Sequence, residues 1–255
     1  MVMTPTAYTR TYTAFQTDLE RRIHADVNRV FSEIVPRRTP GALVALDRSQ
    51  EELLAEALGS IFTMYGPLAM SFGMFLFEEY TGRTAEALLD DALPAATSSV
   101  FALSRKSANP LPLLRGSITR HVLNRARGVI HHSAASNEDL AYARVPNYAG
   151  QRHGKGPCEF CIVLASRGPV YADTEKAGAR GTGNEYHDDC YCVPQIMKKG
   201  NPEKGDFGDP SEWPKGYNPE RLYHEIYDPS HEYLDTIRDV TRKIRAKDHT
   251  FPLGR

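Results

Sequence analysis

The stretch "ALGSIFTMYGPLAMSFGMFLF", residues 57–77, decides the fold of this chain. It runs for 21 residues without a charged side chain, which is long enough for a helix that crosses a bilayer. Three glycines, Pro67 and several hydroxyl side chains interrupt it, and its flanks carry no strong basic asymmetry. We therefore expect a buried central helix, bent near Gly66 and Pro67, and no stable membrane insertion.

Amphipathic helical patterns lie on both sides of this stretch. Apolar residues recur at spacings of three and four, which places them on one helix face. The predicted helices are 10–35, 49–80, Thr84 to just before Pro94, 98–108 and 111–134. The last of these also carries a basic side, which we expect to be a solvated face that is available to phosphate or to an acidic partner. This basic side consists of Arg115, Arg120, Arg125 and Arg127.

Composition sets broad limits on function. The 255 residues are 41% hydrophobic and 25% charged, which allows one large or two modest domains with a real core. A net charge of −1 gives no overall attraction to nucleic acid or anionic lipid. The first residues, "MVMTPTAYTRTYTAF", do not have the pattern of a secretory signal, so we expect a reducing compartment.

The character of the chain changes after about residue 137. Turn-rich sequence leads into a short cysteine-bearing segment, and glycines and prolines gather again in 198–219. A last amphipathic pattern, 230–247, predicts a C-terminal helix. We predict an α+β fold in three parts. These are a helical domain at 1–135, a small Cys/His-stapled α+β module at 136–197, and an extended arm with a terminal helix at 198–255.

All four cysteines fall within the module, together with one histidine. Cys158 and Cys161 form a Cys-x-x-Cys pair, and His187, Cys190 and Cys192 form His-x-x-Cys-x-Cys. Two such clusters are typical of a tetrahedral zinc site, for which four of these five groups would suffice. If Tyr191 lies in a strand, Cys190 and Cys192 point to opposite faces, and one of them is left out.

Three interpretations of this constellation remain open. A structural zinc ion would supply folding free energy to a module that is too small for a core of its own. Disulfides are the alternative, either within each cysteine pair or between the pairs. A nucleophilic cysteine with His187 as its base, or a metal-dependent nuclease, is the third, although five clustered groups exceed what a dyad needs.

The same segment resembles a known family. Its motifs are the lead-in Arg144-Val145-Pro146, the Cys-x-x-Cys pair, the run 164–168 followed by Tyr171, and the closing run 186–192. These motifs are similar to those of the MuF-like minor capsid, or head morphogenesis, proteins of tailed bacteriophages, in the branch that infects actinobacteria. The matching core covers 141–195, and the seven residues "QRHGKGP" lengthen the loop before Cys158.

The resemblance implies a virion protein inside the capsid, made in the host cytoplasm, that takes part in head morphogenesis and in genome delivery. Its implied partners are the portal protein and the capsid interior, with packaged DNA as a further candidate, and several copies per head are compatible with this role. Some relatives carry an ADP-ribosyltransferase-like fold, but this sequence has no Glu-x-Glu pair, so we expect no catalytic residues and no enzyme. The alternative is an enzyme packaged with the genome, either a nuclease or an ADP-ribosyltransferase-like effector.

Overall fold

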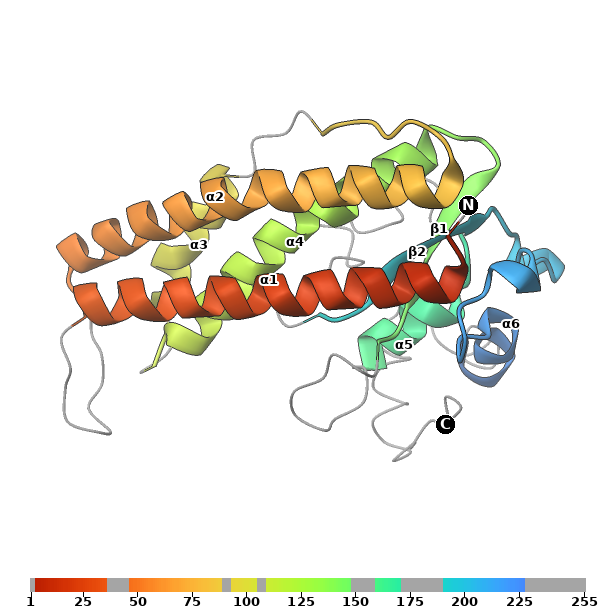
Figure 1. Ribbon diagram of the computed structural model, residues 1–255. Helices are drawn as coiled ribbons and strands as arrows, with labels where there is room; N and C mark the ends of the chain where they lie inside the picture. Colours follow the sequence, from red (N-terminus) through yellow and green to blue (C-terminus); the bar gives the residue numbers. More distant parts are fainter. Residues whose placement is uncertain are drawn as a thin grey trace.

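A computed structural model gives the architecture of the chain (Figure 1). The structure describes six ranges, which are residues 3–35, 46–88, 93–104, 109–147, 159–170 and 190–227. In these ranges the chain is mainly helical with one small sheet, which confirms the predicted α+β class.

Four helices make up the larger part of the described residues, and Figure 1 shows α1 and α2 running side by side with α4 crossing beside them. Their bounds are α1 Pro5–Ile34, α2 Arg48–Thr81, α3 Leu93–Ser104 and α4 Leu111–Ala135. The predictions for 10–35, 49–80 and 111–134 are therefore confirmed, with α1 beginning five residues earlier at a Thr4 cap. A long apolar periodicity identifies such helices well, because most helix stability in proteins comes from packing an amphipathic face.

The 57–77 stretch lies within α2, which continues through Pro67. Helix α2 is long and apolar enough to cross a membrane. A core helix of a globular protein meets the same criteria of length and composition, so these criteria do not distinguish the two. One face of the stretch is buried against the other helices, with Leu58, Phe62 and Leu76 at 0%, 7% and 0% exposure. The expectation of a core helix thus holds for this face.

The start of α2 is fixed by a reciprocal cap. The Asp47 carboxylate accepts from the Gln50 backbone N–H at 2.8 Å, and the Gln50 side chain accepts from the Asp47 backbone N–H at 3.1 Å. This capping box satisfies two backbone donors that the helix itself leaves unpaired. It explains why α2 begins directly after Asp47.

Replacing Asp47 with alanine should lower the free energy of unfolding by about 1 kcal/mol, because the cap is lost. Urea unfolding followed by circular dichroism would measure this change. Ser49→Ala, at an exposed first-turn position with no capping role, is the matched control and should change stability by less than about 0.5 kcal/mol. Equal losses in the two variants would contradict the cap.

The predicted helix from Thr84 to Pro94 is wrong for its first part. Gly82 ends α2 in the left-handed conformation at φ 69°, and residues 82–88 are not helical. The backbone N–H groups of Ala85 and Glu86 instead donate to the side chains of Glu78 and Ser133. Side-chain acceptors thus replace the helical partners that the propensity of "TAEALL" would have favoured.

The second helical prediction in this region, 98–108, shares only part of its range with α3. Helix α3 begins earlier, at Leu93, and carries Pro94 in its first turn, where the missing N–H costs nothing. It ends at Ser104, and residues 105–108 lie outside the described ranges.

The small module contains a two-stranded antiparallel sheet and one short helix. Strand β1, Leu140–Val145, pairs with β2, Val193–Lys198, and α5 spans Glu159–Ser166. The buried phenol of Tyr8 on α1 donates to the Pro194 carbonyl at 2.7 Å, so the sheet is attached directly to the bundle. Burial raises the pKa of Tyr8 well above that of an ordinary phenol, so this donor keeps its proton.

The segment 198–219, predicted as an irregular arm, packs closely on the rest of the molecule. It contains two short 3₁₀ turns and leads into α6, Pro219–Leu222, and a final π turn, Tyr223–Tyr227. Tyr217 is buried and donates to the Ala165 carbonyl of α5 at 2.8 Å. Trp213 is half-buried and packs against the same apolar core as Tyr217.

One apolar cluster draws residues from all three predicted domains. It includes Tyr12 of α1, Val129 of α4, Val163 of α5, Ile196 of β2 and Leu222 of α6. The module and arm therefore share core with the bundle in the described residues. The boundaries 1–135, 136–197 and 198–255 stay a prediction, and the expected helix at 230–247 lies outside the described residues.

Candidate metal centre

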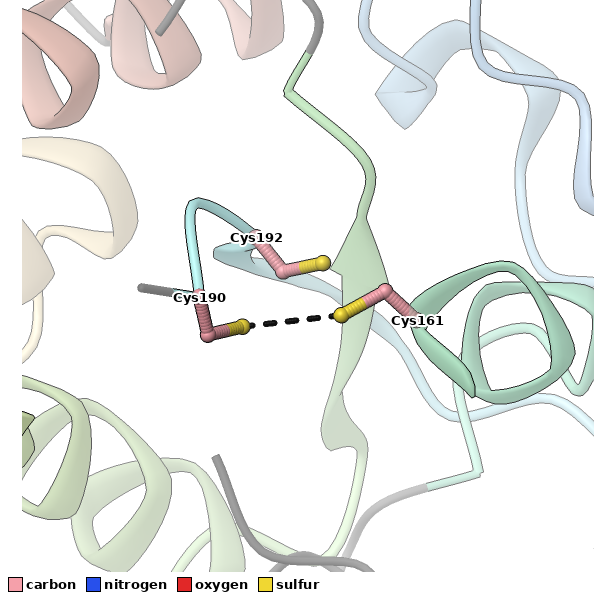
Figure 2. Close-up of side chains that lie close together, drawn as sticks. All are labelled: Cys161, Cys190 and Cys192. Carbon is pink, nitrogen blue, oxygen red and sulfur yellow. Dashed lines mark hydrogen bonds between the residues drawn. The ribbon is translucent and has the colours of Figure 1, made fainter. Parts of the chain in front are cut away.

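Three cysteine side chains meet at one buried point between α5 and the segment that precedes β2. Cys161 lies in the first turn of α5, and Cys190 and Cys192 come directly before β2 (Figure 2). Their sulfur atoms all lie within 4.8 Å of one another, and the Cys161 and Cys190 sulfurs are 3.5 Å apart. Exposure is 2%, 4% and 2%, so the cluster is closed to solvent.

These distances fit a metal better than a disulfide. Sulfurs arranged around one zinc ion at about 2.3 Å lie roughly 3.8 Å from each other, within the range found here. A disulfide requires a separation of about 2.0 Å, and none of the three described cysteines is part of a disulfide. Three sulfur donors of this kind suit a soft or borderline ion, and a tetrahedral site would need one more ligand.

Cys190 and Cys192 both belong to the cluster, so neither is left out. The condition for excluding one of them was an extended strand through Tyr191, but β2 begins only at Val193. The backbone before the strand turns so that both sulfurs face Cys161, as Figure 2 shows. The other two predicted ligands, Cys158 and His187, lie outside the described residues, and each is a candidate for the fourth position.

The pKa of Cys192 argues against a nucleophilic role for this thiol. A hydrogen bond with Cys161 lowers the pKa of the Cys192 thiol, but the hydrogen bond with Cys190 and burial raise it, and the net pKa is well above that of an ordinary thiol. A reactive cysteine needs the opposite shift, because the thiolate is the nucleophile. A bound cation would instead drive deprotonation of all three thiols.

The segment that carries Cys190 is held by the helical bundle. The Cys190 backbone carbonyl accepts hydrogen bonds from the Gln16 amide at 2.9 Å and from the Arg127 guanidinium at 2.7 Å. The next residue, Tyr191, donates through its phenol to the Glu20 carboxylate at 2.9 Å. Two of the three cysteines, Cys190 and Cys192, therefore lie in a loop that α1 and α4 hold in place.

A small polar cavity lies beside this attachment. It has a volume of about 10 Å³, which is space for roughly one water molecule. Its lining comes from α1, α4 and the cysteine segment, and consists of Gln16, Glu20, Thr119, Arg120, Leu123, Arg127, Cys190 and Tyr191.

Sequence reasoning missed the residues that surround the cluster. Arg127 was expected on a solvated face but is 3% exposed, because α4 is covered by the cysteine segment on that side. Arg144 was quoted only as part of a motif, yet it is fully buried on β1, and its charge acts on Cys192. Nothing in the sequence indicated a role for Gln16, because single polar residues are common at the edge of the apolar face of a helix.

Comparison with known proteins identifies the family. The family model described as VG15 protein matches residues 3–227, which covers most of the chain and every described element. No curated protein and no solved structure matches the chain. The match indicates a family of phage virion-associated proteins. The chain belongs to the VG15 protein family.

Proposed function

We propose that this protein is a minor capsid protein that lies inside the phage head near the portal, acts in head morphogenesis and genome delivery, and has no enzymatic activity. The observation that carries the proposal is the family match over 3–227, which includes the bundle and the cysteine module together. The resemblance of the module to MuF-like head morphogenesis proteins supports the finer assignment. The protein would pass through the host cytoplasm during assembly and remain in the virion.

The cysteine cluster supports a structural role within that function. We propose that it is a zinc clamp formed by Cys161, Cys190 and Cys192, with Cys158 or His187 as the fourth ligand. The sulfur positions and their burial support this assignment. Zinc with four protein ligands is structural rather than catalytic, because no position is left for water or substrate.

An exposed apolar face supports a contact with another virion component. Leu53, Met64, Leu68 and Phe75 are 49–63% exposed, and all lie on one side of α2. The helix carries no charged side chain from 57 to 77, so the part of this face that holds Met64, Leu68 and Phe75 would bury no charge of its own against an apolar partner surface. We assign this face to the portal contact.

The test is co-purification with the portal. The protein co-expressed with a tagged portal should be recovered with the portal ring, and quantitative mass spectrometry of mature particles should find it at low copy number. Leu68→Glu should remove it from the ring without changing its circular dichroism, whereas Thr63→Glu, at an exposed position elsewhere on α2, should not. A protein absent from particles and from the ring would contradict the proposal.

The enzyme alternative has its own test. Purified protein would be incubated with plasmid DNA and divalent ions, and separately with NAD and host lysate. We expect neither cleavage nor ADP-ribosyl transfer. Turnover that disappears in His187→Ala would overturn the non-enzymatic assignment.

A further inference from the structure

The carbonyl group of Cys190 is the point where the cysteine cluster and the helical bundle are joined. It accepts two hydrogen bonds from two different helices, from Gln16 on α1 and from Arg127 on α4. Both donors are almost completely buried, at 2% and 3% exposure. A backbone group that is held from two sides has little freedom to rotate, so the part of the backbone that carries the Cys190 side chain is held in place.

A second attachment lies one residue further on. The Tyr191 phenol donates to Glu20, which is 4% exposed and stands one helical turn after Gln16. The hydrogen bonds of Gln16 and Glu20 thus attach two consecutive residues of the loop to one face of α1. They place Cys190 and Cys192 on the side that faces Cys161.

The charge of the surroundings also favours a metal-thiolate centre. Three thiolates around one divalent cation carry a net negative charge, and burying such a charge is costly unless opposite charge lies near it. Arg127 places its guanidinium on the peptide of one ligand, and the fully buried Arg144 lies on the strand paired with β2. Cationic groups therefore approach the cluster from α4 and from β1.

We propose that Gln16 and Arg127 are positioning residues for the metal centre, which hold the Cys190 loop in its ligating form, and that Arg127 also offsets the charge of the thiolates. This inference rests on the proposed zinc clamp. Outer contacts of this kind commonly change metal affinity by 10- to 100-fold when they are removed. A consequence is that metal binding and the packing of α1 and α4 on the module are one linked equilibrium.

The experiment measures metal affinity in the full-length chain. Zinc dissociation constants would be determined by competition with a chromogenic chelator for wild type, Gln16→Leu and Arg127→Met. Both variants should bind zinc about 10- to 100-fold more weakly than wild type. Thr17→Leu makes the same kind of change at the neighbouring exposed position and should bind within about two-fold of wild type.

Cobalt spectra distinguish positioning from general destabilisation. A merely structural role would lower the melting temperature but leave the thiolate-to-cobalt charge-transfer band of the loaded protein unchanged, whereas loss of positioning should weaken or shift it. Arg127→Lys keeps the charge and one donor, so it should recover part of the affinity and of the band. It also provides a testable variant if Arg127→Met does not fold.

The outcomes separate the two proposals. Wild type that takes up no zinc or cobalt would overturn the zinc clamp, and the positioning role with it. Wild type that loads one ion per chain, with Gln16→Leu, Arg127→Met and Arg127→Lys all equal to it in affinity and spectrum, would overturn only the positioning role.

Discussion

Cys161→Ser is expected to abolish stoichiometric zinc binding and to unfold the cysteine module. A serine hydroxyl is a poor zinc ligand, and the change removes one of three sulfurs that lie within 4.8 Å of one another. Structural zinc contributes about 10–16 kcal/mol in zinc-finger peptides, so loss of the centre should cost this chain about 5 kcal/mol or more. That is comparable with the whole stability of an ordinary domain, about 5–15 kcal/mol.

Metal analysis and thermal unfolding of the purified protein would measure both effects. Wild type should contain close to one zinc ion per chain, and a strong chelator should lower its melting temperature to that of the variant. Chelation should leave Cys161→Ser unchanged, which is the internal control. A variant that keeps its zinc and its melting temperature would contradict the clamp.

The same protein preparations distinguish zinc from disulfides and identify the fourth ligand. If the clamp is metal, all four cysteines should react with a thiol reagent after denaturation with chelator and without reductant. Of Cys158→Ser and His187→Ala, the variant that loses zinc marks the fourth ligand. Unreactive cysteines in metal-free protein would support the disulfide alternative.

Gly73→Ala is expected to destabilise the protein by about 2 kcal/mol, because it forces α2 away from α4. A methyl group at this position would lie 2.7 Å from the Ala126 carbonyl oxygen and 2.9 Å from its Cα atom. These are backbone atoms within α4, so no side-chain rotation can relieve the contact. The apolar residues that line the contact would be separated along with the two backbones.

Gly66→Ala is the matched control on the same helix. Its added methyl group would meet nothing closer than 3.7 Å, and alanine stabilises a helix by up to about 1 kcal/mol relative to glycine. Urea unfolding should therefore place Gly73→Ala well below wild type and Gly66→Ala at or above it. If the two variants have the same stability, the close approach of α2 and α4 is wrong.

The helices were predictable where one periodic apolar face covered the whole element. Tyr12, Leu19, Ile23 and Val27 of α1 follow such a pattern, and all four are buried. The region after Gly82 was not predictable, because its backbone N–H groups donate to the side chains of Glu78 on α2 and Ser133 on α4. Propensity describes local preference and cannot register an acceptor that arrives from another helix.

The cysteine cluster was predictable for a different reason. Metal ligands need few residue types at short spacings, and the sequence shows such a pattern, of which the structure brings Cys161, Cys190 and Cys192 together. The sequence could not show that Cys190 and Cys192 point to the same side. That depends on where β2 begins, which its pairing with β1 decides.

By itself, the sequence determined the helical class, the existence of a cysteine centre and the resemblance to phage head proteins, because each of these depends on local pattern. The tertiary structure alone decided which polar residues lie around the cysteine cluster. Gln16, Arg127 and Arg144 come from three separate elements and meet the cluster only because α1, α4 and β1 pack around it. An arginine looks the same in the sequence whether its guanidinium is buried or exposed to solvent. Only the elements that pack around it in the folded chain decide which of the two it is.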